Sequence, residues 1–326
     1  MIIITGAAGF IGSAIAWKLN ESGREDLILV DKLRTEEKWK NIAKRDYIDW
    51  VDRDELFEYL SNEDIAKKVE AVIHMGACSA TTEKDMDFLM KNNYEYSKKL
   101  WEFCTKYNIK YIYASSAATY GMGEQGYNDE IDLEGHKNLR PLNKYGYSKK
   151  IFDVWALKQK NTPKNWAGFK FFNVYGPNEY HKGRMASMVF HSYNQAKENG
   201  YVKLFKSHNK NFEDGKQLRD FVYIKDVVSV IEYFLNNDIE NGVYNLGTGK
   251  ERSFYDLAYN TLVSAKENPK IEFVDMPMDL RGRYQYYTKA EMNKLRKVGY
   301  TKEFYTLEEG IKDYVENYLE KEDKYL

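Results

Sequence analysis

The sequence predicts an α/β protein that consists of a doubly wound parallel sheet and a smaller C-terminal α/β lobe. Two observations lead to this fold class. Short apolar runs alternate with stretches of helical periodicity in the first half of the chain, which is typical of right-handed βαβ units. After Asn173 the alternation becomes less regular, and loop-rich stretches appear at 175–184 and 206–219. A chain of 326 residues is long enough to form both parts.

The apolar pattern assigns the elements in order along the chain. We expect strands at 1–5, 26–31, 71–74, 110–115 and 167–173. Helical periodicity predicts helices at 12–22, 84–107 and 147–158. Further along we expect a helix at 185–197, a strand–helix unit at 221–235, and a final strand at 242–246. The polar stretch 206–216 has no apolar period, so we expect a mobile segment or a lid over a ligand.

The bulk composition argues against several classes of protein. The 49 basic and 50 acidic side chains nearly cancel, so no net field favours nucleic acid or an anionic membrane. Cys78 and Cys104 form neither a disulfide framework nor a zinc pattern, and we expect inert thiols and no metal site. The apolar run 1–4 is too short for a signal peptide or a membrane span. The sequence therefore predicts a cytoplasmic protein without membrane or nucleic-acid partners.

A glycine motif follows the first expected strand. Residues 6–12 read Gly-Ala-Ala-Gly-Phe-Ile-Gly and open the first expected helix. In that position glycines permit a tight turn and a close approach of the backbone to a pyrophosphate, which the free N–H groups of the helix can bind. The spacing is G-x-x-G-x-x-G, and the strand, the helix and an acidic residue at the end of the second strand support the same interpretation. Gly6, Gly9 and Gly12 therefore predict a Rossmann-type dinucleotide site.

The residues around Asp31 bear on which dinucleotide binds. Asp31 lies nineteen residues after Gly12, where a carboxylate would hold a ribose hydroxyl and favour NAD. Lys32, Arg34 and Lys38 crowd the same loop, where they either pair with a 2′-phosphate or are solvated loop charges. We therefore expect NADP and keep NAD open. The predicted domains are an NADP-binding Rossmann domain of residues 1–172, to which 221–247 returns, and a substrate-binding lobe of residues 173–326.

A tyrosine and a lysine one helical turn apart occur in Tyr145-Gly146-Tyr147-Ser148-Lys149. The Lys149 ammonium can lower the pKa of the Tyr145 phenol, which then takes a proton from an alcohol whose carbon gives hydride to a nicotinamide. The pattern is short, and Tyr94 with Lys98 matches it as well. Position distinguishes the two pairs, because Tyr145 follows the strand that ends at Ser115-Ser116, at the sheet edge where ligands bind. We expect Tyr94 to pack or face solvent, and Ser116 to hydrogen-bond the reacting oxygen.

Longer runs accompany these motifs. They are 74–79 (His-Met-Gly-Ala-Cys-Ser), 115–121 (Ser-Ser-Ala-Ala-Thr-Tyr-Gly), 172–177 (Phe-Asn-Val-Tyr-Gly-Pro), 181–183 (His-Lys-Gly), 185–187 (Met-Ala-Ser), 219–222 (Arg-Asp-Phe-Val) and 282–285 (Gly-Arg-Tyr-Gln). With the glycine motif and the Tyr145/Lys149 pair, they resemble the extended short-chain dehydrogenases/reductases that act on nucleotide-sugars. More narrowly, essentially the whole chain resembles the ADP-L-glycero-D-manno-heptose 6-epimerases.

The resemblance implies an epimerase that interconverts ADP-D-glycero-D-manno-heptose and ADP-L-glycero-D-manno-heptose with bound NADP. The substrate is oxidised at C6″, the planar carbonyl turns over, and hydride returns to its other face. A carbonyl presented in two orientations needs an acid/base on each side, and the resemblance assigns these roles to Tyr145 and Lys182, supported by Lys149 and Ser116. A lysine base needs a lowered pKa, and Arg184 is a candidate for a cationic neighbour that lowers it. The family is typically oligomeric, so we expect a homo-oligomer.

The resemblance also implies two sets of binding residues. Besides the three glycines, the cofactor is expected to contact Phe10, Ile11, Asp31, Lys32, Lys38, Arg53, Met75, Gly76, Ala77, Cys78, Ser79, Asn92, Lys149 and Val174. The substrate is expected to contact Asn173, Arg184, His191, Phe205, Lys206, Ser207, His208, Arg219 and Tyr284. Arg219 is the natural clamp for a diphosphate because a guanidinium can bind two oxygens at once. His191 and Tyr284 could equally be packing residues.

Three other functions share this scaffold. A 4,6-dehydratase needs an acid and a base beside the serine, and Ala117 and Ala118 at those positions cannot transfer protons. A UDP-hexose 4-epimerase stays open as the alternative, since it would use Tyr145 and Ser116 and would not need Lys182. A non-catalytic NADP-binding sensor is less favoured, because it would have no use for the Tyr145/Lys149 pair.

Overall fold

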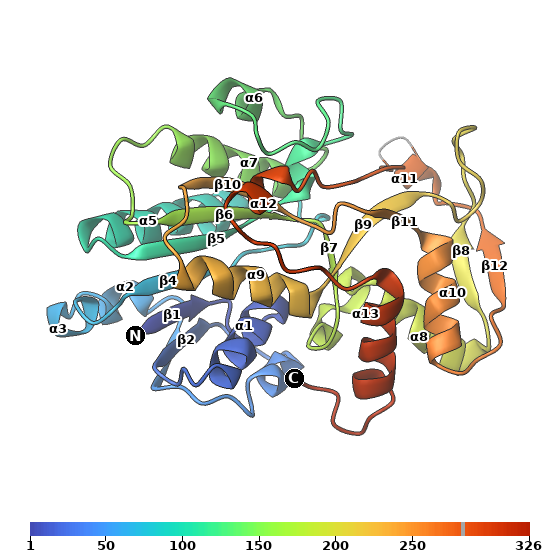
Figure 1. Cartoon of the computed structure of the whole chain (residues 1–326), viewed down its shortest axis with the longest axis horizontal. Helices are drawn as coiled ribbons and strands as arrows, with labels where there is room; N and C mark the ends of the chain where they lie inside the picture. The colour runs from blue at the N-terminus through green and yellow to red at the C-terminus, as the bar shows by residue number, and fades with distance from the viewer. Residues whose placement is uncertain (282–283) are drawn as a thin grey trace.

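The computed structural model describes residues 1–281 and 284–326, and its largest element is a seven-stranded parallel sheet (Figure 1). The strand order is β10-β6-β5-β4-β1-β2-β3. The strands are β1 (Ile2–Thr5), β2 (Leu27–Asp31), β3 (Asp49–Asp52), β4 (Ala71–His74), β5 (Lys110–Ser116), β6 (Trp166–Phe171) and β10 (Gly242–Leu246). The chain moves outward from β1 through β2 to β3, then crosses to β4 and continues outward on the other side. This reversal confirms the predicted doubly wound sheet and places the topological switch point, where such folds bind ligands, between β1 and β4.

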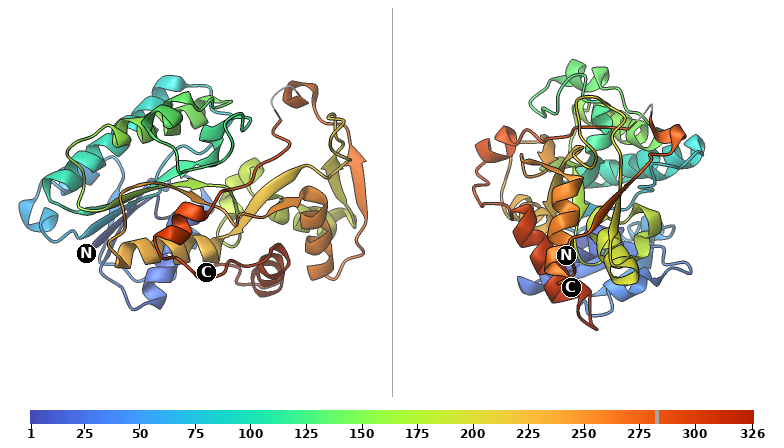
Figure 2. Two further views of the ribbon diagram at one scale, coloured as in Figure 1. Left: turned by 45° about the horizontal axis from the view of Figure 1, so that its top comes forward. Right: turned by 90° about the vertical axis from the view of Figure 1, so that its right-hand side faces the viewer.

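Residues of β1 alternate between two hydrophobic layers. Ile2 and Ile4 belong to a core cluster with α1 (Phe10–Glu21) and α9 (Ile224–Asn236), whereas Ile3 belongs to a second cluster with α5 (Tyr96–Lys106) and α7 (Lys144–Leu157). Because neighbouring side chains of a strand point to opposite faces, a strand covered on both sides is apolar throughout. Figure 2 shows the two helical layers on either side of the sheet. The continuous run Ile2–Ile4 is therefore explained by burial on both faces.

The C-terminal lobe is built on two small sheets, on the right of Figure 1. One contains β7 (Asn173–Tyr175), β9 (Leu218–Tyr223) and β11 (Glu251–Ser253), and the other contains β8 (Val202–Phe205) and β12 (Ile271–Val274). Three longer helices cover them, α8 (Met188–Asn199), α10 (Phe254–Ser264) and α13 (Leu307–Tyr314). The shorter α-helices are α2 (Leu56–Tyr59), α3 (Glu63–Ala66), α4 (Met86–Leu89), α6 (Leu133–Asn138), α11 (Met278–Arg281) and α12 (Asn293–Lys297). The 3₁₀ helices are Glu37–Asn41, Ala117–Tyr120 and Tyr180–Met185, and the π-helices are Met90–Glu95 and Val315–Leu319.

The structure differs from the sequence-based assignment at several elements. Strand β3 was not predicted, because only Val51 of its four residues is buried and the segment reads as polar. The single strand expected at 167–173 is divided between β6 in the large sheet and β7 in the lobe. The unit expected at 221–235 is similarly divided, since β9 pairs with β7 and β11 while α9 packs against α1. The division of the chain into two domains stays a prediction.

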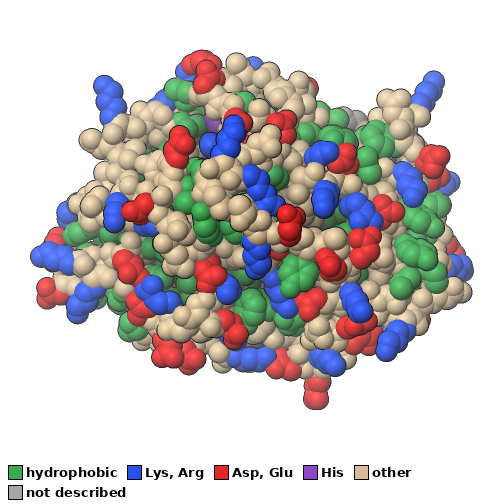
Figure 3. Space-filling model, viewed as in Figure 1, with side chains coloured by type: hydrophobic (Ala, Val, Ile, Leu, Met, Phe, Trp, Pro, Cys, Tyr) green, Lys and Arg blue, Asp and Glu red, His purple; other side chains and the backbone are tan. Residues whose placement is uncertain are grey.

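Charge is evenly distributed over the face of the molecule in Figure 3, where basic and acidic side chains intermingle and no field of one sign stands out. None of the helices in the described ranges combines the length and the apolar character required to cross a membrane. The segment 206–216 contains neither helix nor strand, and its closure over a ligand stays a prediction.

Candidate active site

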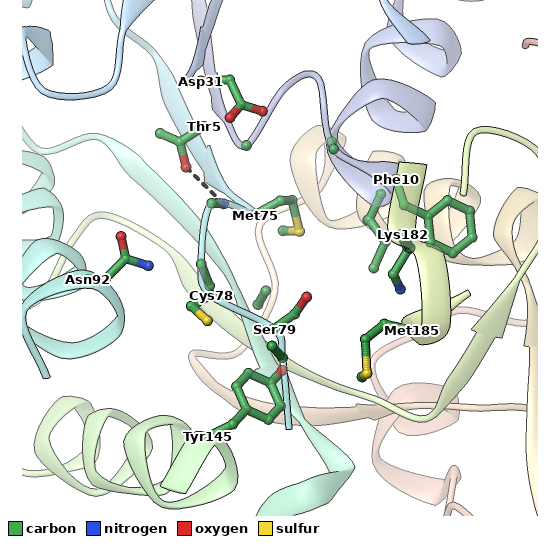
Figure 4. Close-up of a pocket in the computed structure, with 18 of the residues that line it drawn as sticks. Thr5, Phe10, Asp31, Met75, Cys78, Ser79, Asn92, Tyr145, Lys182 and Met185 are labelled. Carbon is green, nitrogen blue, oxygen red and sulfur yellow. Dashed lines mark hydrogen bonds between the residues drawn. The ribbon is translucent and has the colours of Figure 1, made fainter. Parts of the chain in front are cut away.

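A cavity of about 660 Å³ opens at the carboxyl edge of the large sheet, beside the ends of β1, β4 and β5 (Figure 4). A volume in this range suits a cofactor-sized ligand. Each residue predicted to bind the cofactor lines this cavity, as do Tyr145, Lys149, Lys182 and Ser116. The fold therefore brings segments that are far apart in the sequence to one site at the topological switch point.

The glycine motif forms the floor of the cavity. Gly6 has a positive φ of 67°, and a Cβ atom there would lie 2.6 Å from the backbone nitrogen of Gly76. A Cβ atom on Gly12 would lie 2.1 Å from the carbonyl oxygen of Gly6. Because no side chain fits between the turn and α1, the backbone around Gly9 and Phe10 lines the cavity directly at the start of the helix. This cradle fits the pyrophosphate of a dinucleotide, which N–H groups at a helix N-terminus bind.

We predict that Gly12→Ala weakens both the fold and cofactor retention. The added methyl group overlaps the Gly6 carbonyl, and overpacking of this kind costs about 1–3 kcal/mol of unfolding free energy. Thermal denaturation and quantification of nucleotide released from the purified protein test the prediction. Gly23→Ala is the control, because no atom of the described residues lies within 4 Å of its Cβ position and only its positive φ of 78° is strained. An unchanged Tm and unchanged nucleotide content in Gly12→Ala would contradict the assignment of the cradle.

Asp31 is engaged with the protein at the end of β2. Its Oδ2 accepts a hydrogen bond from the Ala8 N–H at 2.9 Å, and its Oδ1 accepts from the Lys32 N–H at 2.7 Å. The Lys38 ammonium also donates to Oδ1, at 2.8 Å, from the 3₁₀ helix Glu37–Asn41. Lys32 and Arg34 line the same end of the cavity. Both oxygens of the Asp31 carboxylate are thus occupied, and the cations around it include Lys38, paired with Asp31, and Lys32, paired with Asp54.

Tyr145 and Lys149 are held in the first two turns of α7. The helix begins after Asn143, whose side chain accepts a hydrogen bond from the Gly146 N–H at 2.8 Å. The Lys149 ammonium is almost fully buried and donates to the Ala114 carbonyl at 2.8 Å. Burial lowers the pKa of Lys149 to about 8, and the charge of Asp153 opposes that shift.

The structure corrects the expectation that Lys149 holds the Tyr145 phenol at a low pKa. Burial raises the pKa of Tyr145, and the group that lowers it is Ser116, through a hydrogen bond. The physical reason is that the Lys149 ammonium is directed to the Ala114 carbonyl, while the phenol lies in a desolvated pocket. The second Tyr-x-x-x-Lys match packs as expected, with the Tyr94 ring edge-on to Phe152 at 6.5 Å.

Lys182 enters the cavity from the 3₁₀ helix Tyr180–Met185, on a different element from Tyr145 (Figure 4). Its ammonium lies 5.2 Å from the centre of the Phe10 ring. Burial lowers the pKa of Lys182, and the charge of Glu179 opposes that shift. The expectation that Arg184 supplies the lowering was wrong, because Arg184 is exposed and is not among the groups that shift Lys182. Desolvation alone produces the lowered pKa.

The predicted substrate residues lie outside this cavity. Asn173 and Arg184 are exposed, His191 is half-buried on α8, and Phe205 through His208 lie at the end of β8 and in the following loop. Arg219 and Tyr284 are brought together, with the guanidinium 5.3 Å from the centre of the Tyr284 ring. Arg219 is 7% exposed and donates to the carbonyls of Leu218 and Gln285, and in the described ranges no carboxylate faces it. A buried cation without a carboxylate partner suits an anionic ligand.

Some residues that line the cavity had no role assigned from the sequence, apart from Arg34, which was a candidate partner of a 2′-phosphate. The cavity is also lined by Thr5, Arg34, Glu36, Ala80, Glu83, Phe88, Tyr96, Ala114, Ser115, Phe171, Phe172, His181 and Met185. Thr5 and Phe171 end strands of the large sheet, and Ala114 and Ser115 are the two residues before the end of β5, so their positions were a usable signal. Of the run 282–285, Gly282 and Arg283 lie outside the described residues. Gln285 donates a hydrogen bond to the Gly121 carbonyl and so connects this segment to the turn after Ser116.

The fold and the glycine cradle define a protein of the Rossmann type with a dinucleotide-binding site. Residues 2–247 match the model of a family described as the NAD dependent epimerase/dehydratase family, and the chain belongs to that family. A curated relative from Fusobacterium nucleatum subsp. nucleatum is 64% identical over 100% of both chains, and one from Nitratidesulfovibrio vulgaris is 49% identical over 100% of both. Both are named ADP-L-glycero-D-manno-heptose-6-epimerase, and within the larger family the chain belongs with these proteins.

A solved structure agrees with this placement. The crystal structure of ADP-L-glycero-D-manno-heptose-6-epimerase from Helicobacter pylori is 31% identical, with a TM-score of 0.80, and the match covers 97% of this chain and 95% of that one. The predicted fold class and the predicted family are therefore confirmed. The description of the family also supports a nicotinamide dinucleotide as cofactor.

Proposed function

We propose that the chain interconverts ADP-D-glycero-D-manno-heptose and ADP-L-glycero-D-manno-heptose by transient oxidation at C6″. The observation that carries this proposal is the placement of Tyr145 and Lys182 on separate elements around one cavity (Figure 4). A carbonyl whose two faces are used in turn needs a proton donor and acceptor in each orientation. The names of the curated relatives support the choice of sugar.

The protein residues divide the chemistry as follows. When bound, the nicotinamide supplies the hydride acceptor and donor. Tyr145 takes or returns the proton of the C6″ hydroxyl in one orientation, and Ser116 hydrogen-bonds the same oxygen. Lys182 exchanges the proton in the other orientation, and its desolvated position favours the neutral form that a base requires. Arg219, which is buried and which no carboxylate of residues 1–281 and 284–326 faces, holds the diphosphate of the substrate.

Incubation of the purified protein with ADP-D-glycero-D-manno-heptose, without added cofactor, tests the proposal. NMR should show the L-glycero epimer appearing until the two epimers reach equilibrium, and the same mixture should form from the L-glycero epimer. UDP-glucose run in parallel tests the alternative, a UDP-hexose 4-epimerase. Inversion at C4 of the UDP-sugar, with ADP-heptose unchanged, would overturn the choice of substrate.

We further propose that the dinucleotide is NADP. The support is the occupied Asp31 carboxylate and the cations Lys32, Arg34 and Lys38 around it, which suit a 2′-phosphate better than a ribose hydroxyl. Assembly into a homo-oligomer and a cytoplasmic location stay predictions of the sequence.

Lys38→Ala tests the choice of NADP. Removal of one charged hydrogen bond to a phosphate costs about 1.5–3 kcal/mol, so we expect the Kd for NADP to rise by about 10- to 100-fold while the Kd for NAD changes little. Titration of nucleotide-free protein measures both constants. Lys40→Ala is the matched control, because Lys40 lies in the same 3₁₀ helix but pairs with Glu37 and does not line the cavity. Equal losses for NADP and NAD would contradict the proposal.

A further inference from the structure

A fully buried ion pair joins β6 to α7 next to the 3₁₀ helix Ala117–Tyr120. The Lys170 ammonium on β6 is 3.0 Å from Asp153 Oδ2 on α7, and both residues are 0% exposed. Burial of two charges is unfavourable unless their geometry and additional hydrogen bonds compensate. Neither residue lines the cavity or takes part in the proton transfers described above.

Hydrogen bonds connect the pair to the elements that carry the active-site residues. Asp153 accepts from the Ser115 hydroxyl at 2.6 Å and from the Tyr113 hydroxyl at 3.0 Å, both on β5. Lys170 donates to the Thr119 hydroxyl at 2.5 Å, and Thr119 donates to the Ser116 carbonyl at 2.9 Å. The pair therefore contacts β5, α7 and the turn after Ser116 at once.

Asp153 also stands one helical turn after Lys149 on α7. The two residues make adjacent contacts with the end of β5, since Lys149 binds the Ala114 carbonyl and Asp153 binds the Ser115 hydroxyl. These two bonds fix the position of α7 along β5, and with it the position of Tyr145 relative to Ser116.

We propose that Asp153, supported by Lys170, is a positioning residue of the active site that sets the placement and the charge of Lys149 and Tyr145. This inference rests on the proposed function, in which Tyr145, on the same helix as Lys149, takes or returns the proton of the C6″ hydroxyl. Asp153 touches neither substrate nor cofactor and acts through its neighbours.

The charged and titratable groups around Asp153 and Lys149 determine in which direction loss of the Asp153 charge shifts the pKa of Lys149 and of Tyr145. Asp153 is faced by the cations Lys149 and Lys170, by the phenols of Tyr113, Tyr120 and Tyr145, and by His136. Lys149 is faced by Asp153, Cys78 and His74. The carboxylate raises the pKa of both Lys149 and Tyr145, and Lys170 is not among the groups that shift either one. Removal of the carboxylate charge should therefore lower both pKa values.

Asp153→Asn tests this effect because it removes the charge and keeps the size of the side chain. The pKa of Lys149 lies near 8 and that of Tyr145 lies above its ordinary value, so we expect Lys149 to set the acidic limb of the kcat profile and Tyr145 the alkaline limb. We expect both limbs to move toward lower pH by about 1 unit, so that the whole profile shifts. A purely structural role would lower activity or Tm without a shift of the profile.

Two further variants separate the contribution of the ion pair to Tm from the effect of the Asp153 charge on the pH profile. Lys170→Met leaves Asp153 without its ion-pair partner and should lower Tm most, whereas Asp153→Asn combined with Lys170→Met removes both charges and should recover much of that loss. The double variant should nevertheless keep the shifted profile, because Asp153 is the group that acts on Lys149 and Tyr145.

The outcomes distinguish this inference from the proposed function. A wild-type pH profile in either Asp153→Asn or the double variant, measured with an active wild-type enzyme, would overturn the positioning role and leave the epimerase proposal intact. Wild-type protein that inverts no ADP-heptose would overturn the proposed function itself. The expected result is a displaced profile in both variants, together with a lower Tm in Lys170→Met than in the double variant.

Discussion

Tyr145→Phe is expected to reduce kcat for ADP-heptose epimerisation by about 10³-fold, with little change in Tm. General acid–base groups contribute about 10²- to 10⁴-fold to catalysis, and phenylalanine fills the same space without the exchangeable proton. Initial rates in both directions, measured by NMR, give the effect. The phenol is hydrogen-bonded with Ser116 and lines the cavity, and in the proposed mechanism its loss removes the proton acceptor at the reacting oxygen.

Tyr94→Phe is the matched control for this variant. Tyr94 belongs to the second Tyr-x-x-x-Lys pattern, but its ring packs edge-on against Phe152 and it does not line the cavity. We expect wild-type kcat in Tyr94→Phe. Comparable activity in the two variants would show that position in the fold does not distinguish the two patterns.

Lys182→Met is expected to reduce epimerisation in both directions by about 10²-fold or more. Each conversion needs proton transfer once in each orientation of the carbonyl, so loss of either group interrupts both directions. Methionine preserves the length of the stem that packs beside Phe10 and removes only the ammonium. Lys203→Met, an exposed lysine on β8, is the control for substitution of a lysine in the same lobe.

This variant also separates the two epimerase hypotheses. A UDP-hexose 4-epimerase would use Tyr145 and Ser116, and its activity would not depend on Lys182. Full activity of Lys182→Met would therefore contradict the two-sided mechanism and favour that alternative. A loss similar to that of Tyr145→Phe would support equal roles for the two groups.

The cofactor half of the site could be predicted from the sequence because its signals are local. Gly6 to Gly12 follow a strand and open a helix, and Asp31 ends the next strand, so short stretches of sequence specify where these residues lie. Lys182 was placed through resemblance alone, and the structure then supplied a physical cause for its lowered pKa, namely burial. Arg184 was wrongly expected to lower the pKa of Lys182, because proximity in sequence does not determine which side chains are buried together.

The positions of the predicted substrate residues depend on tertiary contacts, which the sequence does not show directly. Arg219 meets Tyr284 only because the segment around Tyr284 runs beside β9, as shown by the hydrogen bond from the Leu218 N–H to the Tyr286 carbonyl. Likewise, the division of 167–173 between β6 and β7 follows from which partner strands are available. The apolar pattern of the sequence does not show which strands pair. Strand β3 was not predicted because this edge strand buries only one of its four residues and so shows no apolar pattern.

In the proposed reaction C6″ loses and regains the same hydrogen, and Tyr145 and Lys182 transfer only the hydroxyl proton. ADP-D-glycero-D-manno-heptose labelled with deuterium at C6″ tests it most directly, in ordinary water and without added cofactor. The account predicts that the L-glycero product forms with inverted configuration and retains the deuterium. Inversion accompanied by loss of the label to solvent would mean that the carbon itself is deprotonated, and it would contradict the account.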